Sequence, residues 1–251
     1  MTALSLVVNT VSKNRDLWPI FFDRIARYTT TNLFNKIYVF VDCPDEDIPP
    51  ACHVVQFDRE QTYKEQFSTC IKEVQEEYCI YISEDYILYD TVREDLISRY
   101  LDVLEANKEL SFIRFMKGGL TDLLYPQFKS YEDVRELHHS FPYFYTNQAA
   151  IWRTRDLEKI HVRGPNLHIG NNDWENSFEY QATTTCRELD IRGAHCYHGE
   201  PKRGLYHYDS IVFPHVATAL VKGKWNMSEY PHVMQDIVSE YDIDTAVRGQ
   251  N

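Results

Sequence analysis

Apolar runs and amphipathic segments alternate along the first half of the chain. Runs rich in Val, Ile, Tyr and Phe predict strands, because β-branched and aromatic residues fit a buried sheet. Segments with apolar residues at helical spacing separate these runs. The strands are expected at 4–11, 36–42, 53–58, 79–83 and 110–116, and the helices at 15–30, 62–78 and 91–107. This order indicates an α/β fold with a central, mostly parallel sheet flanked by helices.

The second half of the chain has a less regular pattern. It predicts a strand at 148–154 with a short helix after it, a helix at 171–189, a strand from 191 followed by a polar, basic loop, and two helices across a turn within 214–241. No linker composition separates the two halves. We therefore expect one domain over residues 1–251, with helical elements at its C-terminal end.

Composition narrows the class of protein. The chain has 251 residues, a formal charge of −12 and no apolar run of the roughly 18 residues that a membrane span needs. This charge disfavours tight binding to nucleic-acid backbones. The six cysteines form no CxxC pair, which is typical of reduced thiols, and the N-terminal segment lacks the features of a signal peptide. We expect a cytoplasmic protein.

Polar residues end three of the predicted strands, at Thr10 to Arg15, at Asp42, and at Glu84 with Asp85. Ligands of open α/β sheets bind outside the carboxyl ends of the strands, so these residues are expected to border one crevice. Adjacent carboxylates suit a hard divalent cation such as Mg²⁺ or Mn²⁺. The pair could equally cap the next helix or face water.

Three further groups carry candidate chemistry. Asp42 is suited to accept hydrogen bonds from a nucleotide base or ribose, or it simply opens a loop. His198 could bind a metal, and Lys202 and Arg203 beside it could neutralise a diphosphate. The segment "GNNDWENSFE" places Asp173 and Glu175 near a predicted helix start, where one could be a general base and the other a cap or a solvent-facing charge.

In the order of these motifs the chain resembles glycosyltransferases of the GT-A fold, over about residues 4–200. The shared features are the first strand and loop "VVNTVSKNR", the acidic end of the second strand, and a strand that runs into an acidic motif. That family usually has Asp-x-Asp at the last position, where this chain has "SEDY" with no carboxylate at Tyr86 or Ile87. The resemblance implies a single Rossmann-like domain, with a nucleotide-sugar-binding half at about 1–116 and an acceptor-binding half at about 117–251.

The resemblance also implies roles for individual residues. Asp85 and His198 would hold Mn²⁺ or Mg²⁺, and Asp173 would be the general base with Glu175 in reserve. The donor, a UDP- or GDP-sugar, would contact Thr10, Val11, Ser12, Arg15, Asp42, Lys64, Glu84, Lys202 and Arg203. Trp174 and the aromatic segment 141–148 could stack on sugar rings, and the basic segment 221–226 could close over the site.

The implied reaction is transfer of a sugar to a hydroxyl of a glycan or another acceptor, by an inverting single displacement. Three alternatives stay open. The acceptor could be a modified DNA base, which the net charge disfavours. A nucleotidyltransferase would usually carry glycine in the loop after the first strand, and "NTVSKNR" has none. The third alternative is a sugar-binding or nucleotide-binding module that has no metal and no catalytic activity.

Overall fold

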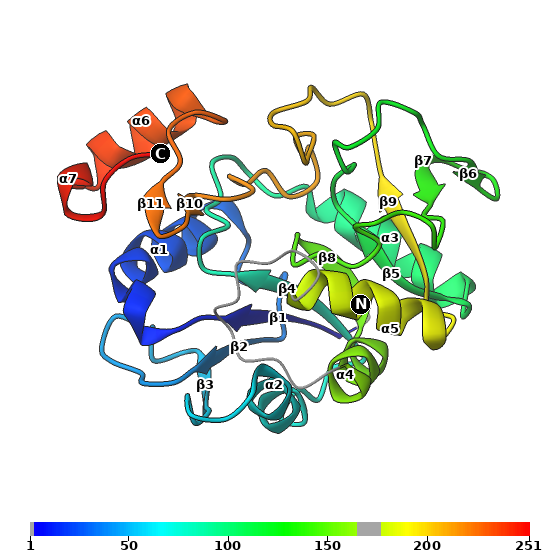
Figure 1. Ribbon diagram of the computed structural model, residues 1–251, viewed down its shortest axis with the longest axis horizontal. Coiled ribbons are helices and arrows are strands. Elements are labelled where there is room, and N and C mark those ends of the chain that lie inside the picture. The colour runs from blue at the N-terminus through cyan, green and yellow to red at the C-terminus, as the bar shows by residue number, and fades with distance from the viewer. Residues whose placement is uncertain (1–2, 165–176) are drawn as a thin grey trace.

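The computed structural model describes residues 3–164 and 177–251, which form one continuous sheet with helices on both sides (Figure 1). The strands are β1 (Leu4–Asn9), β2 (Lys36–Val41), β3 (His53–Gln56), β4 (Tyr78–Ser83), β5 (Leu110–Arg114), β6 (Gln127–Phe128), β7 (Tyr131–Glu136), β8 (Ala150–Arg153) and β9 (Arg192–Cys196). They make a nine-stranded sheet in the order β3-β2-β1-β4-β8-β5-β9-β7-β6. Only β7 and β8, among the described strands, run against the common direction.

Helices cover both faces of the sheet, as the alternating pattern predicts. One face packs against α1 (Trp18–Tyr28) and α3 (Glu94–Ala106), and the opposite face packs against α2 (Tyr63–Ile71), α4 (Thr154–Arg163) and α5 (Phe178–Glu188). Successive residues of β1 point to opposite faces, so Leu6 and Val8 contact the first layer and Val7 the second. Because both faces are buried, the strands are continuous apolar runs rather than alternating ones.

The two halves of the chain share this sheet. Strand β8, from the second half, lies between β4 and β5 and is antiparallel to both. A short 3-10 helix, η1 (Ser12–Leu17), joins β1 to α1, and Pro19 lies in the first turn of α1 as expected. No helix in the described part of the chain is long and apolar enough to cross a membrane.

Several elements differ from the sequence prediction. Helix α2 ends at Ile71 rather than at residue 78, because the chain must reverse direction before β4 begins at Tyr78. The strands β6 and β7 were not predicted, since 127–136 is mostly polar and lies at the sheet edge. The expected pair of helices within 214–241 contains only α6 (Pro231–Glu240), which is followed by the short α7 (Thr245–Arg248).

A hairpin takes the place of the first of those two helices. Its strands are β10 (Leu220–Val221) and β11 (Lys224–Trp225). Lys222 and Gly223 at its tip have φ values of 52° and 78°, in the left-handed region that tight hairpin turns require. A helix cannot continue through two such residues.

A third apolar cluster attaches this C-terminal segment to the carboxyl ends of the strands. Trp225 and Met234 pack with Leu17 and Ile20 from the start of α1, and with Ile87 from the segment after β4. The hairpin therefore lies beside the loops that follow β1 and β4, although more than a hundred residues separate it from them in the sequence.

Candidate functional site

The carboxyl ends of β1, β2 and β4 meet at one edge of the sheet, as predicted. In the parallel register Asn9 pairs with Ser83 on one side and with Phe40 on the other, so the following residues emerge together. A cavity of about 350 Å³ opens there, which we call the strand-end cavity. It is lined by Asn9, Thr10, Val11, Lys13, Asn14, Ser83, Glu84, Asp85, Leu220 and Gly223.

The acidic pair forms the floor of the strand-end cavity. Glu84 is buried, and its Oε1 accepts a hydrogen bond of 2.6 Å from Nδ2 of Asn14. The backbone carbonyl of Asp85 accepts from the backbone N–H of Ala219 at 3.1 Å, which ties the C-terminal segment to this point. Burial raises the pKa of both carboxyl groups, and the charge of Glu84 raises the pKa of Asp85 further. Burial thus favours the neutral forms of these two groups, and a cation bound beside them would favour their charged forms.

The chemistry of the donor set fits a hard divalent cation only in part. Asp85 and Glu84 supply carboxylate oxygens, which Mg²⁺ and Mn²⁺ prefer, and such ions commonly complete their coordination with substrate phosphates and water. Among residues 3–164 and 177–251, no group of three or more His, Cys, Asp or Glu side chains is placed to hold a metal. A cation here would therefore depend on oxygen atoms that a ligand brings.

Asp42 follows β2, on the other side of β1 from the acidic pair, and holds the first loop. Its carboxylate accepts from the backbone N–H of Ser12 at 2.6 Å and from the Ser12 hydroxyl at 2.8 Å. Burial alone would raise the pKa of Asp42, but these hydrogen bonds outweigh it and the pKa is lowered. Asp42 is thus a charged acceptor at the strand end, with Arg59 3.7 Å away.

The remaining residues expected at the donor site lie at different depths. Thr10 is buried and accepts a 2.8 Å hydrogen bond from the indole of Trp18, whereas Val11 is half-buried. Arg15 is exposed and lies 3.7 Å from Asp45. Lys64 is half-buried in the first turn of α2, behind the capping box of Thr62, and is not among the residues that line the strand-end cavity.

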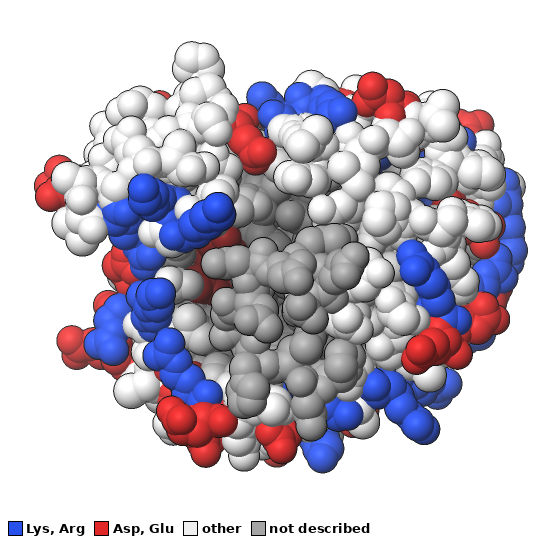
Figure 2. All heavy atoms as spheres, in the orientation of Figure 1, with Lys and Arg blue, Asp and Glu red and all other residues white. Residues whose placement is uncertain are grey.

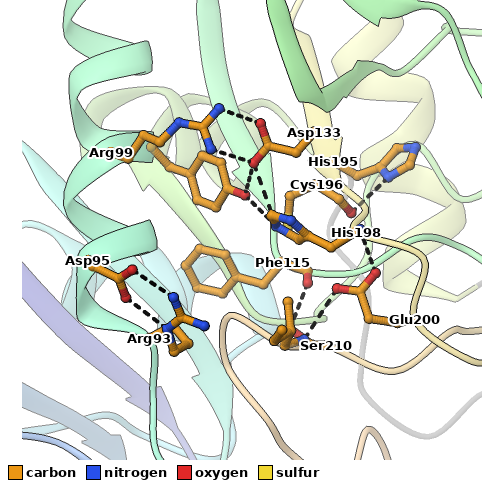
Figure 3. A network of polar contacts seen from close by, with 12 residues as sticks. Arg93, Asp95, Arg99, Phe115, Asp133, His195, Cys196, His198, Glu200 and Ser210 are labelled. Carbon is orange, nitrogen blue, oxygen red and sulfur yellow. Dashed lines mark hydrogen bonds and ion pairs between the residues drawn. The ribbon is translucent and has the colours of Figure 1, made fainter.

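His198 lies in a separate polar network (Figure 3). Its Nε2 is 2.9 Å from the hydroxyl of Tyr100 and 3.5 Å from Asp133, which also binds Arg99. It lines another pocket, together with Arg203, and that pocket does not include Asp85. The structure therefore does not bring His198 and Asp85 together, although the sequence predicted that both would bind one metal.

The two basic residues after His198 have carboxylate partners of their own. Arg203 donates to Asp209 at 2.6 Å, and Lys202 lies 3.3 Å from Asp122. Neither lines the strand-end cavity. The candidate bases Asp173 and Glu175, and Trp174 between them, lie outside the described residues. The helix expected at 171–189 begins at Phe178, where the Ser177 side chain caps it.

Three lysines at this cavity belong to segments that the sequence had indicated, the loop 10–15 and the basic segment 221–226, although none of them was given an individual role. Lys13 lines the strand-end cavity, and Lys222 and Lys224 flank Gly223, which lines it from the hairpin. Figure 2 shows Lys and Arg side chains gathered over the hairpin side of this face. The lysines with ion-pair partners in the described part of the chain are Lys108, Lys129, Lys159 and Lys202. Lys13, Lys222 and Lys224 are thus cations without an anionic partner there.

A second cavity, of about 500 Å³, lies on the other side of the acidic pair and is called here the tyrosine cavity. Tyr86, directly after Asp85, lines it, while Thr218 and Val221 border it from the same segment whose Leu220 and Gly223 border the strand-end cavity. Its other lining residues include Arg114, Tyr143, Asn147, Gln148, Glu179, Tyr206, His207, Asn226 and Glu229.

Besides Val221 and Asn226, which belong to the basic segment 221–226, the lining of the tyrosine cavity was expected at a site only in the aromatic segment 141–148. That segment divides: Phe141, Phe144 and Tyr145 are buried core, whereas Tyr143 faces the cavity. The polar residues come from separate segments of the chain. No local spacing in the sequence could have grouped them.

Comparisons with known proteins show the fold and leave the activity open. No protein-family model and no curated protein matches the sequence. The structure of S. aureus TarS 1-349 in complex with UDP-GlcNAc aligns with a TM-score of 0.50 and 15% identity, over 98% of this chain and 69% of that chain. The UDP complex of TarS 1-349 gives 0.50 and 14%, over 98% and 68%. The bifunctional IspDF from Campylobacter jejuni gives 0.45 and 11%, over 84% of this chain and about half of that chain, 52%.

At such identities the likeness concerns the fold alone. The chain has a Rossmann-like α/β fold with a large, mostly parallel central sheet flanked by helices, so the predicted fold class is confirmed.

Proposed function

We propose that this protein is an enzyme that transfers a sugar from a nucleoside diphosphate sugar to a hydroxyl group. The observation that carries the proposal is the strand-end cavity, where buried Glu84 and half-buried Asp85 share one lining with Lys13, a cation without an ion-pair partner among the described residues. A diphosphate bridged by a divalent cation needs both kinds of charge in one place. The fold is shared with TarS, which has been solved with UDP and with UDP-GlcNAc.

The chain's own residues would position the donor, a UDP- or GDP-sugar, at the strand ends. Asp42 accepts from a base or ribose hydroxyl while Ser12 keeps it charged and fixed. Lys13 and the hairpin lysines Lys222 and Lys224 compensate the charge of the leaving diphosphate, the role first expected of Lys202 and Arg203. Asn14 holds Glu84 in place beside Asp85.

A divalent cation, Mn²⁺ or Mg²⁺, would be held by Asp85 with Glu84 beside it and would neutralise charge on the diphosphate as the bond to the sugar breaks. The acceptor hydroxyl is a weak nucleophile until a carboxylate takes its proton. We assign that base to Asp173, with Glu175 in reserve, which makes the reaction an inverting single displacement.

A DNA acceptor finds no support in the charge distribution. The net charge is −12, and Figure 2 shows Asp and Glu side chains interspersed among Lys and Arg over this face. A duplex-binding surface would concentrate cations instead.

Thermal unfolding with a panel of nucleotide sugars tests the proposal. The panel contains UDP-GlcNAc, UDP-glucose, UDP-galactose and GDP-mannose, each with Mn²⁺, Mg²⁺ or EDTA, and slow hydrolysis of the sugar is followed in parallel. At a hundredfold excess over Kd one donor should raise the midpoint by roughly 5 to 10 °C. Asp85→Asn should lose this rise, whereas Asp102→Asn, at an exposed position on α3, should keep it. A wild-type protein that no nucleotide stabilises would contradict the proposal.

A further inference from the structure

The donor contacts proposed above do not use the tyrosine cavity. This cavity nevertheless contains buried polar atoms that have no hydrogen-bond partner among the described residues. His207 is 4% exposed, and its Nε2 has no hydrogen-bond partner among the described residues. The nearest carboxylate oxygen, Oε2 of Glu229, is 3.6 Å away, which is too long for a hydrogen bond. A buried nitrogen without a partner is costly, so its position calls for an explanation.

The imidazole of His207 is held firmly although Nε2 is unsatisfied. Its ring lies parallel to that of Tyr230, with an interplanar angle of 7° and centroids 5.9 Å apart. Burial lowers the pKa of His207 against the opposing effect of Glu229, which favours the neutral ring. A neutral imidazole nitrogen pairs with a hydroxyl group, as donor or as acceptor according to its tautomer.

Asn147 supplies a second unsatisfied atom in the same cavity. Its Oδ1 is buried and has no partner in the described part of the chain, while its backbone N–H donates to Oε1 of Glu179 at 2.9 Å. The side chain of the neighbouring Gln148 already has a hydrogen-bond partner within the protein, because its Nε2 donates to the carbonyl of Ala217 at 3.1 Å. The cavity thus offers a nitrogen and an oxygen that a hydroxyl-bearing ligand could satisfy.

The charges of the lining disfavour an anionic ligand. Glu179 and Glu229 both line the tyrosine cavity, and the described lining contains no lysine. The one arginine, Arg114, directs its Nη2 at the backbone carbonyls of Tyr143 and Phe144, at 3.0 and 2.7 Å. A carboxylate or phosphate on the ligand would therefore face two carboxyl groups. This differs from the strand-end cavity, whose lining includes Lys13, a lysine without an ion-pair partner among the described residues.

The shape and the remaining lining suit a sugar ring. Tyr86, Tyr143 and Tyr206 present aromatic surface, which packs against the apolar face of a pyranose while polar groups bind its hydroxyls. A volume of about 500 Å³ lies within the range of small-molecule pockets.

We infer that the tyrosine cavity selects an uncharged saccharide ring, whose hydroxyls satisfy Nε2 of His207 and Oδ1 of Asn147, and that Glu179 and Glu229 reject acidic sugars. The inference rests on the proposed function and specifies its substrate class. The ring is either the sugar of the donor or the sugar of the acceptor, and the two sources share this chemistry. Binding measurements separate them.

The experiment has two series of titrations of the full chain in the presence of Mn²⁺. In the first series the ligands are UDP, UDP-glucose and UDP-glucuronic acid. In the second series the complex with UDP is titrated with methyl glucoside or methyl glucuronide. The variants are His207→Phe, which keeps the ring stacked on Tyr230, and Asn147→Ala. His232→Phe, at an exposed position on α6, is the matched control. Each cavity variant should lose about tenfold in affinity for the neutral sugar, the loss expected from one hydrogen bond.

The pattern of the losses identifies the source of the ring. If the donor sugar occupies the cavity, UDP-glucose loses affinity while UDP does not. If the acceptor occupies it, methyl glucoside loses affinity while both nucleotides keep theirs. In either case the glucuronide should bind more weakly than the glucoside to the wild type, and Glu229→Gln should narrow the gap.

Two results would overturn the inference: equal binding of glucoside and glucuronide in both series, or unchanged sugar affinity in both His207→Phe and Asn147→Ala. If His207→Phe fails to fold, Asn147→Ala decides alone, because its Oδ1 makes no contact that folding needs. The UDP titration reports on the strand-end cavity only. Absence of UDP binding would therefore count against the proposed function. A change in affinity for the sugars alone concerns only the tyrosine cavity.

Discussion

The two cavities that meet at Asp85 and Tyr86 differ in the charge of their linings. The strand-end cavity is lined by buried Glu84, half-buried Asp85 and the exposed Lys13, which has no ion-pair partner among the described residues. Among its described lining residues the tyrosine cavity has two carboxyl groups and Arg114 but no lysine, together with amide, imidazole and phenol groups. One lining suits a diphosphate with its cation, and the other suits neutral hydroxyls.

The cavities also differ in how the chain builds them. The strand-end cavity is made mainly from residues that directly follow β1 and β4, and the C-terminal hairpin adds one wall. The tyrosine cavity draws on loops far apart in the sequence, which the third apolar cluster and the central sheet bring together. The position of a site at strand ends follows from the sheet topology, whereas the second site depends on how the loops pack. Perturbing that packing should affect the two cavities unequally.

The largest effect is expected from acid, through His215 beneath the tyrosine cavity. His215 is fully buried, its Nδ1 donates to the carbonyl of Phe213 at 2.6 Å, and its Nε2 lies 3.3 Å from Oε1 of Gln148, which lines the cavity. Burial lowers the pKa of His215 to about 4. The unfolded chain takes up the proton near pH 6.5, so this contribution to stability is present above about pH 6.5 and is lost as the pH falls toward 4.

The difference of about 2.5 pKa units corresponds to about 3 kcal/mol of unfolding free energy between about pH 7 and about pH 4. His215→Gln cannot take up the proton. In urea unfolding, the free energy of unfolding of this variant should therefore fall less between about pH 7 and about pH 4 than that of the wild type, by that amount. His232→Gln, exposed on α6, should unfold as the wild type does at both pH values. If the stability of His215→Gln fell with pH as much as that of the wild type, the pH dependence would come from other buried groups.

The strand-end cavity could be predicted from the sequence to a greater extent than the tyrosine cavity. Its strands are long apolar runs, and a parallel sheet places their carboxyl ends together, so Glu84 and Asp85 line one cavity with Thr10 and Val11, whereas Asp42 at the end of β2 is not among the lining residues. A turn was expected within 214–241, but the segment before it was predicted as a helix from its apolar spacing, and the structure forms the β10–β11 hairpin there instead.

Other features had no local signal at all. The position of β8 between β4 and β5 results from tertiary pairing, and it was not visible in any periodicity. His207 and Glu229 approach each other only through the fold, 22 positions apart in the sequence. His198 was assigned to the metal site through the resemblance to GT-A glycosyltransferases, yet it lies near Tyr100 and Asp133 instead.

A smaller effect, confined to the strand-end cavity, is expected from Lys13→Met. Lys13 is an unpaired cation in the cavity lining, and loss of one charge-assisted contact to a phosphate should weaken UDP binding by about tenfold. Uridine, which has no phosphate, should bind equally to both proteins, and the UDP difference should shrink at high salt. Lys108→Met removes an exposed lysine paired with Glu105 and serves as the control. An equal loss for uridine and UDP would place Lys13 at the nucleoside instead.

The smallest effect is expected at Arg248, which links the C-terminal segment to the strand-end cavity. Its Nη2 donates to Oδ1 of Asn14 at 3.3 Å and it forms an ion pair with Asp16, while Asn14 in turn donates to Glu84. Arg248→Met removes an ion pair whose aspartate is half exposed, although the arginine side chain itself is only 12% exposed, so the free energy of unfolding should fall by about 1 kcal/mol. Donor affinity should fall a few-fold because Glu84 loses its fixed partner, and affinity for the neutral saccharide should not change. Arg155→Met, at an exposed arginine on α4, is the control. If Arg248→Met lowered the affinity for the saccharide as much as the affinity for UDP, the two cavities would respond together. The assignment of separate ligands to them would then be wrong.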